Sequence, residues 1–289
     1  MGVSMIKLLC GPLNRQAWEG FGCLPVYNWN HPELVCEEAR AAGKVWPMIS
    51  GPVTAATVID QYRWPFDHIL WYNEPPLPSL PYCALSGIEN LATKRHIVGN
   101  FKIQFALTGN WSHQRGVILP WYEKALALTP KVVLGVHLYR QDLPSTQVQN
   151  AKDWFSSQLD AILADVPVVA MTEYGVLLAG TSWANGQGPD VEYLTDYMQY
   201  TWTTMRNRSI YAASWYMAQT DNKELMPADG VLCNPDGTLR PLGEVYRDLP
   251  TGDEEGVEPQ PSGTGWVRIS QSLLSAGAEK LRLTVERWA

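Results

Sequence analysis

Two glutamates stand where apolar runs give way to residues that break the chain. Glu74 closes the run of residues 68–74 and precedes two prolines, and Glu173 closes residues 167–173 and precedes a Tyr-Gly pair. A carboxylate at the end of a buried strand is costly unless it is paired or used in chemistry. One carboxyl group can donate a proton while a second attacks carbon. The pair therefore predicts a two-carboxylate active site at the mouth of a parallel barrel.

Short β-rich runs alternate with longer helical stretches along residues 1–250. The predicted strands are residues 5–10, 23–27, 44–49, 68–74, 101–107, 132–138, 167–173 and 210–217. The predicted helices are residues 31–42, 53–62, 80–96, 117–128, 147–164, 191–206 and 241–247. Residues 15–20 leave room for only about one helical turn after the first strand. Eight strand–helix units in about 250 residues predict an α/β fold, a (β/α)8 TIM barrel.

The composition changes after Pro250, which predicts the end of the barrel. Residues 251–265 are rich in glycine, proline and acidic side chains and are typical of a linker. Residues 266–289 contain two alternating runs that predict a β-hairpin-like extension. Because a lone hairpin is not stable in water, we expect it either to dock on the barrel or to begin a truncated accessory module.

By this count Glu74 ends the fourth strand and Glu173 the seventh. These strands can place two carboxyl groups on opposite sides of a barrel mouth. A separation of about 5 Å suits glycoside hydrolysis with retention, in which one group protonates the leaving oxygen and the other attacks the anomeric carbon.

Four motifs carry a resemblance to a known group of enzymes. They are Asn73-Glu74-Pro75, His137-Leu138-Tyr139, Thr172-Glu173-Tyr174-Gly175 and Ser214-Trp215-Tyr216. In order and spacing they resemble the retaining glycoside hydrolases of clan A, the 4/7 superfamily of TIM barrels. The resemblance covers roughly residues 1–250.

The resemblance implies a role for each matching residue. Glu74 would be the general acid/base and Glu173 the nucleophile, and the charge of Glu173 would raise the pKa of Glu74 so that it holds its proton. The other implied roles are a hydrogen bond to the sugar 2-hydroxyl from Asn73, orientation of the nucleophile by Tyr139, an apolar floor from Trp215, and lining of the mouth by His137. Taken alone, a strand-end glutamate can also cap a loop, and such a histidine or tryptophan can belong to the core.

One feature of the clan is missing, and it concerns the nucleophile. Many members carry an arginine near the end of the second strand, but residues 26–30 read Val-Tyr-Asn-Trp-Asn. Asn28 or Asn30 could donate to Glu173 instead, or Trp29 could shape a sugar site. Without the cation, we expect Glu173 to be held less firmly as an anion.

The aromatic composition offers further candidates for sugar contacts. The chain contains thirteen Trp and thirteen Tyr but only five Phe. This composition is consistent with side chains that stack on sugar rings, and equally with a core built from large aromatic residues. Asn110, Trp111 and Trp183 are candidate walls of the sugar site.

Charge and cysteine content exclude several classes of protein. The net charge is −7 and the 22 Lys and Arg are scattered, which disfavours nucleic acid and anionic membranes as partners. Five cysteines without a close pair favour free thiols over a disulfide framework. Five histidines without a His-x-His pair disfavour a metal-dependent hydrolase. The first residues lack the pattern of a secretion signal, so a cytoplasmic location is the default expectation.

These observations predict a retaining glycoside hydrolase that cleaves β-linked oligo- or polysaccharide. Two carboxyl groups suffice for this chemistry, so we expect no cofactor and no metal. Short loops after most strands favour an open cleft and internal cleavage, and we expect a monomer. The alternative is a non-catalytic carbohydrate-binding barrel, which would have no need of two glutamates at matched strand ends.

Overall fold

The computed structural model describes most of the chain up to residue 250 and two short segments beyond it. The described residues are 5–29, 32–49, 64–78, 85, 88, 91, 93–104, 110–141, 148–177, 190–218, 230–250, 268–270 and 284–286.

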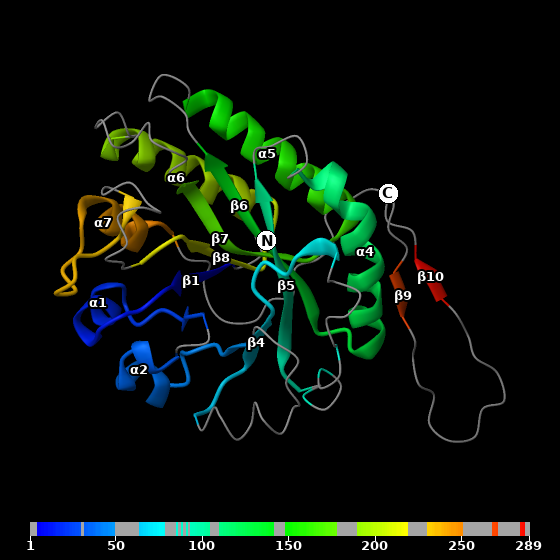
Figure 1. Cartoon of the computed structure of the whole chain (residues 1–289), viewed down its shortest axis with the longest axis horizontal. Coiled ribbons are helices and arrows are strands. Elements are labelled where there is room, and N and C mark those ends of the chain that lie inside the picture. Colours follow the sequence, from blue (N-terminus) through cyan, green and yellow to red (C-terminus); the bar gives the residue numbers. More distant parts are fainter. Residues whose placement is uncertain are drawn as a thin grey trace.

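Eight parallel strands form one sheet that curls into a nearly closed barrel (Figure 1). Its order is β2-β1-β8-β7-β6-β5-β4-β3, and a parallel bridge from Val26 to Val45 joins β2 to the segment that leads into β3. The strands are β1 (Ile6–Cys10), β2 (Val26–Tyr27), β3 (Met48–Ile49), β4 (His68–Trp71), β5 (Arg95–Gln104), β6 (Val132–Gln141), β7 (Val169–Leu177) and β8 (Ala212–Trp215). The predicted α/β class and TIM barrel are confirmed.

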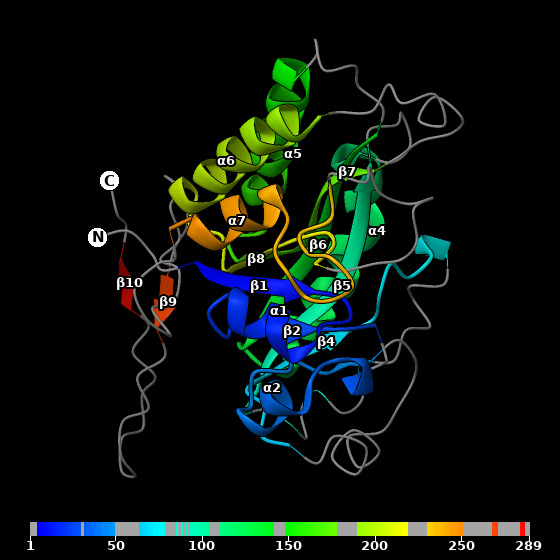
Figure 2. The same ribbon diagram turned by 90° about the vertical axis from the view of Figure 1, so that its left-hand side faces the viewer.

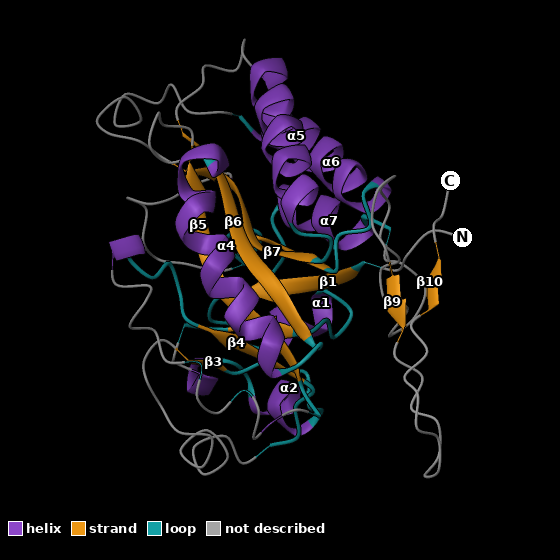
Figure 3. Ribbon diagram, turned by 90° about the vertical axis from the view of Figure 1, so that its right-hand side faces the viewer, coloured by secondary structure: helices purple, strands orange, loops and turns teal. Residues whose placement is uncertain are grey.

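Helices cover the outside of this barrel, and α5 and α6 lie side by side (Figures 2 and 3). The helices are α1 (Arg15–Gly20), the 3-10 helix η1 (Pro32–Leu34), α2 (Glu37–Ala41), α4 (Trp111–Leu128), α5 (Val148–Asp165), α6 (Val191–Asn207) and α7 (Pro241–Asp248). The first helix has the length of little more than one turn, as expected for residues 15–20.

The strands bury both faces, as parallel strands between helices and a barrel interior must. On β1, Leu8 and Cys10 belong to the interior cluster, whereas Leu9 belongs to the layer beneath the helices. On β8, Ala212 belongs to the interior cluster and Ala213 to the outer layer. This alternation decides which side chains can reach the barrel mouth.

Two predicted element boundaries are wrong by six residues. Strand β5 begins at Arg95, not at residue 101, so the predicted helix cannot extend to residue 96. Polar residues open this strand, and they are accommodated because His96 accepts the indole N–H of Trp71 at 2.9 Å. Helix α4 begins at Trp111, not at residue 117, because the side chain of Asn110 caps it. The helix predicted at residues 53–62 lies outside the described residues.

Other predicted elements are shorter or longer than expected. The strands predicted at residues 23–27 and 44–49 pair over two residues each, as β2 and β3. Strands β6 and β7 continue past the predicted ends to Gln141 and Leu177.

Beyond the barrel, β9 (Arg268–Ser270) and β10 (Thr284–Glu286) pair in antiparallel fashion. The division into barrel, linker and extension stays a prediction. In the described part of the chain, no helix combines the length and apolar character needed to span a membrane.

Candidate active site

The backbone brings Glu74 and Glu173 to one end of the barrel. Glu74 follows β4 with a φ of 48°, a left-handed conformation that is uncommon outside glycine and often marks functional sites. Its N–H donates to Asn100 O on β5 at 3.2 Å. Glu173 lies in β7 beside a break in strand register, where His137 of β6 pairs with it. Such an irregularity re-aims a side chain, here toward the mouth.

The two carboxyl groups converge on His137. One oxygen of Glu74, one oxygen of Glu173 and a ring nitrogen of His137 all lie within 4.8 Å of one another. His137 Nδ1 is 3.0 Å from Glu74 Oε1 and 3.4 Å from Glu173 Oε2, and the imidazole is fully buried. The structure thus brings together three residues that the sequence motifs had placed at separate strand ends.

Three aromatic side chains donate hydrogen bonds to Glu173. Tyr139 donates its hydroxyl to Oε2, as the motif resemblance implied. Tyr27 donates its hydroxyl to Oε1 at 3.1 Å, and Trp29 donates its indole N–H to the same oxygen at 2.8 Å. The neutral donors anticipated at residues 28 or 30 are therefore found at residues 27 and 29. Asn28 is buried between them, and Asn30 lies outside the described residues.

The surroundings of Glu74 differ from the sequence expectation. Burial acts to raise the pKa of this carboxyl group, but the hydrogen bond and charge of His137, together with Lys102 Nζ 3.5 Å from Oε2, outweigh it. The pKa of Glu74 therefore lies below its usual range, and the expected net increase is wrong. Lys102 belongs to none of the four motifs, and its place in β5 does not indicate which loop its side chain faces.

Asn73 has a side chain suited to an external partner. Its Oδ1 is buried, and no described residue forms a hydrogen bond with it. Buried polar atoms are normally satisfied, so this oxygen is available to a ligand group.

Trp215 does not form the floor of the site. Its side chain is 1% exposed and belongs to the layer beneath the helices, where it packs edge-on against Tyr174 and donates its indole N–H to Gly230 O. The next residue, Tyr216, is partly exposed and has its ring centroid 5.4 Å from Tyr139 and 5.7 Å from Trp29. The period of two along β8 would have predicted this exchange, because it turns Trp215 outward and Tyr216 inward.

The candidate walls at the start of α4 also have other roles. Asn110 accepts the backbone N–H of His113 and caps the helix. Trp111 is fully buried and donates its indole N–H to Asp165 Oδ2 at 2.7 Å. A side chain enclosed in this way has no face left for a sugar, so Trp111 does not form a subsite wall. Trp183 lies outside the described residues.

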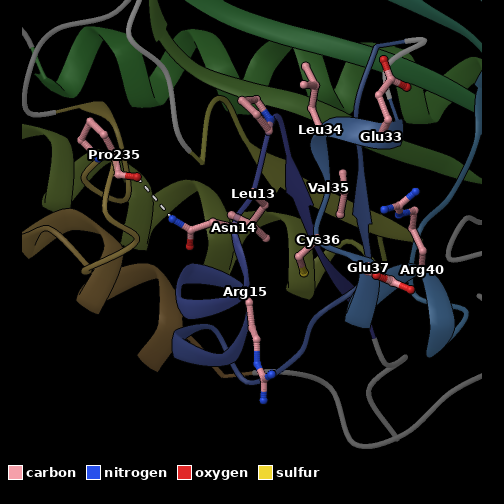
Figure 4. Close-up of a pocket in the computed structure, with 11 residues that line it drawn as sticks. Leu13, Asn14, Arg15, Glu33, Leu34, Val35, Cys36, Glu37, Arg40 and Pro235 are labelled. Carbon is pink, nitrogen blue, oxygen red and sulfur yellow. Dashed lines mark hydrogen bonds between the residues drawn. The ribbon is translucent and has the colours of Figure 1, made fainter.

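A separate pocket of about 410 Å³ lies where the loops after β1 and β2 meet (Figure 4). A bridge between Leu13 and Val35 and a hydrogen bond from Asn14 Nδ2 to Pro235 O at 3.3 Å tie these loops to the segment after β8. Apolar and charged side chains share its lining, and Leu34 is 54% exposed. The lining includes none of the residues around Glu173.

Comparison with known proteins identifies the family. A model of the glycosyl hydrolase catalytic core matches residues 22–246, more than half of the chain, and the chain therefore belongs to this family. A search of curated proteins gives no significant match. The fold and family together make this chain a glycoside hydrolase, and the resemblance to clan A barrels is confirmed at that level.

The fold is similar to those of several β-1,3-glucanases of glycoside hydrolase family 128. An exo-β-1,3-glucanase of subgroup V from Cryptococcus neoformans has 19% identity and a TM-score of 0.57 over 84% of this chain and 98% of that chain. A subgroup II endo-β-1,3-glucanase from Sorangium cellulosum has 17% identity and a TM-score of 0.54 over 85% and 99%. A subgroup VI exo-β-1,3-glucanase from Aureobasidium namibiae has 17% identity and a TM-score of 0.55 over 86% and 97%.

Proposed function

We propose that the chain is a retaining glycoside hydrolase that cleaves β-linked glycans by double displacement. The observation that carries this proposal is the separation of Glu74 and Glu173, whose nearest oxygens lie within 4.8 Å. Retaining enzymes keep their two carboxyl groups about 5–5.5 Å apart, whereas inverting enzymes leave about 6.5–9.5 Å for a water molecule. The short separation supports direct attack by a carboxylate.

In the first step Glu173 attacks the anomeric carbon while Glu74 gives its proton to the leaving oxygen. The bond from the anomeric carbon to the leaving oxygen breaks, and a glycosyl ester forms on Glu173. Three donors hold the attacking carboxylate, which is 2% exposed, so it need not reorganise as the bond forms. The unpartnered Asn73 Oδ1 is suited to accept the sugar 2-hydroxyl, a contact that strengthens in the transition state.

In the second step Glu74 acts as a base toward water. Its carboxylate, lowered in pKa by His137 and Lys102, takes a proton from the water that attacks the ester. The ester bond breaks, Glu173 leaves as a carboxylate, and the sugar is released with its original configuration. Glu74 then holds the proton needed for the next cycle.

β-1,3-glucan is the substrate class that we propose to test first. The support is similarity of fold to β-1,3-glucanases, with TM-scores above 0.5 for the three named above. Both exo- and endo-acting enzymes are among them, so internal cleavage in an open cleft rests on the short loops of this sequence. The partly exposed rings of Trp29 and Tyr216 are suited to stack on a sugar at the cleavage site.

The test is hydrolysis of β-1,3-glucan and aryl β-glycosides, with the anomer of the first product followed by proton NMR. We expect retained configuration, loss of activity in Glu173→Ala and Glu74→Ala, and recovery of turnover with azide in both. Glu123→Ala, on the exposed side of α4, is the matched control and should keep full activity. An inverted first product, or activity that survives both substitutions in the site, would contradict the mechanism. A slow fall in viscosity relative to sugar release would contradict internal cleavage.

A further inference from the structure

We infer that Tyr27 and Trp29 are positioning residues that hold the nucleophile Glu173 through neutral hydrogen bonds, in the place where clan members use an arginine. This inference rests on the proposed role of Glu173. It adds two residues that none of the four sequence motifs contains.

The two oxygens of the Glu173 carboxylate accept hydrogen bonds from different donors. Oε1 accepts from Tyr27 at 3.1 Å and from Trp29 at 2.8 Å, and Oε2 accepts from Tyr139. The hydroxyl of Tyr27 has one proton, which it shares between Glu173 Oε1 and Thr172 O, 2.7 Å away and one residue before Glu173 on β7. A donor anchored to the strand as well as to the side chain fixes the direction in which the carboxylate points.

The groups that face Glu173 come from five elements. Tyr27 and Trp29 follow from β2, His137 and Tyr139 from β6, Cys10 from β1, Glu74 from the end of β4 and Tyr216 from the end of β8. Among the described residues no lysine or arginine forms an ion pair with Glu173, and Lys102 pairs with Glu74 instead. His137 is the one described residue with a basic nitrogen within 4 Å of a Glu173 oxygen, and that nitrogen lies nearer to Glu74.

Edge-to-face contacts between aromatic rings keep these donors in place. The ring centroids of Tyr27 and Trp29 are 6.3 Å apart at 78°, those of Trp29 and Tyr216 are 5.7 Å apart at 66°, and those of Tyr216 and Tyr139 are 5.4 Å apart at 79°. Such pairs contribute beyond their buried area. The four rings form a chain that begins and ends on an oxygen of Glu173.

Neutral donors suit a group that loses its charge during the reaction. Formation of the glycosyl ester removes the negative charge of Glu173, and an ion pair with arginine would be lost at that step. Hydrogen bonds from a phenol and an indole are weaker than charge-assisted pairs and weaken less when the anion disappears. The arrangement therefore holds the carboxylate in position while leaving it reactive.

The experiment measures the protonation of Glu173 directly, without using turnover. The protein is labelled with glutamate carrying 13C at the side-chain carboxyl, and titrated by NMR in a Glu74→Gln background, so that a second carboxyl group does not couple to the first. We expect Tyr27→Phe and Trp29→Phe each to move the titration midpoint of Glu173 upward by about one pH unit, a tenfold change in its acid constant. The acid limb of kcat/KM in the otherwise native enzyme should move in the same direction.

Two matched controls remove equivalent groups elsewhere in the barrel. Trp18→Phe deletes an indole N–H that donates to Leu24 O at 2.9 Å, and Tyr246→Phe deletes a buried hydroxyl that donates to Leu8 O at 2.7 Å. Neither should move the midpoint, although both can lower stability. A midpoint that stays fixed in both Tyr27→Phe and Trp29→Phe, or that moves equally in the controls, overturns the inference. Shifted midpoints in a protein that hydrolyses no β-glycoside would uphold the positioning role and contradict the proposed reaction.

Discussion

Asn100 Oδ1 accepts a hydrogen bond from Thr172 Oγ1 at 2.8 Å, which links β7, the strand that carries Glu173, to β5, the strand beside Glu74. The side-chain N–H of Asn100 also donates to Tyr72 O at 2.7 Å. The backbone carbonyl of Asn100 accepts the backbone N–H of Glu74. Its side chain is fully buried and its φ is 45°. One asparagine therefore holds the backbone beside both Glu74 and Glu173, and its left-handed conformation is one that asparagine tolerates well.

Asn100→Ala should lower both stability and activity. The substitution removes the Asn100 amide that pairs with the Thr172 hydroxyl and the Tyr72 carbonyl, at a cost of about 1–3 kcal/mol for each of these hydrogen bonds that is not replaced. Because the segments next to both glutamates lose this shared side-chain anchor, while the backbone bond from Glu74 N–H to residue 100 remains, we expect kcat to fall by about tenfold. Urea unfolding and steady-state kinetics on the folded fraction measure the two effects separately.

Asn110→Ala is the control for that variant. It removes the cap of α4, at a cost of about 1 kcal/mol, but it touches neither glutamate. We expect its kcat to match the wild type. If Asn100→Ala also kept the wild-type kcat per folded molecule, the anchoring role would be lost and only a stability role would remain.

Lys102→Met should extend activity toward alkaline pH. Glu74 must be protonated to act as an acid, so kcat/KM falls as the pH rises through its pKa in the free enzyme. The charge of Lys102 helps to hold that pKa down, so its removal should move the alkaline limb to higher pH at low salt. Profiles of kcat/KM against pH, at low and high ionic strength, provide the measurement. Lys124→Met on the exposed side of α4 should leave the limb unchanged, and an equal shift there would attribute the effect to net charge.

Tyr216 and Trp215 should respond in opposite ways to truncation. Tyr216→Ala removes a ring at the mouth, so we expect kcat/KM to fall at least tenfold with a modest change in stability. Trp215→Ala removes a fully buried side chain, at about 3–5 kcal/mol, and should yield little folded protein. Thermal unfolding measures the stability of each variant, and steady-state kinetics measure its kcat/KM. A stable Trp215→Ala enzyme with weakened substrate binding would restore the role that the motif resemblance implied.

The sequence was sufficient for the fold because the strand–helix alternation extends over the whole barrel. The strand-end motifs also singled out Glu74, Glu173, His137 and Tyr139, which the fold brings together. They missed Tyr27 and Tyr216, although the period of two along β2 and β8 points both side chains inward. The motif favours Trp215, whereas the alternation of side chains along β8 favours Tyr216.

Other parts of the site depend on long-range contacts that no local pattern contains. Lys102 and Asn100 lie in a strand whose polar residues give no sign of which loop they face. Their partners, Glu74 and Thr172, are 28 and 72 residues away along the chain, so only the closed barrel defines these pairs.

Acid should destabilise the fold through two histidines, the partly buried His68 and the fully buried His96. Burial lowers the pKa of His68 to about 3 and that of His96 to about 4, helped by nearby Arg95. In the unfolded chain both rings take up a proton near pH 6.5. The stability that these neutral rings contribute is therefore fully present above pH 6.5 and is lost as the pH falls toward 4. The free energy of unfolding should drop by up to about 1.4 kcal/mol per pH unit for each ring.

His68→Phe isolates one of the two contributions. A phenyl ring can keep the stacking on Trp46, whose centroid lies 3.9 Å from that of His68, while removing the titrating group. Urea unfolding between pH 7 and 5 should then show a slope smaller by about 1 kcal/mol per pH unit than in the wild type. Tyr211→Phe removes the hydroxyl that contacts His68 Nε2 but leaves the imidazole buried, so it should lower stability at every pH and keep most of the slope. An unchanged slope in His68→Phe would mean that this ring already takes up its proton in the folded protein, and the loss of stability in acid would then have to come from other groups.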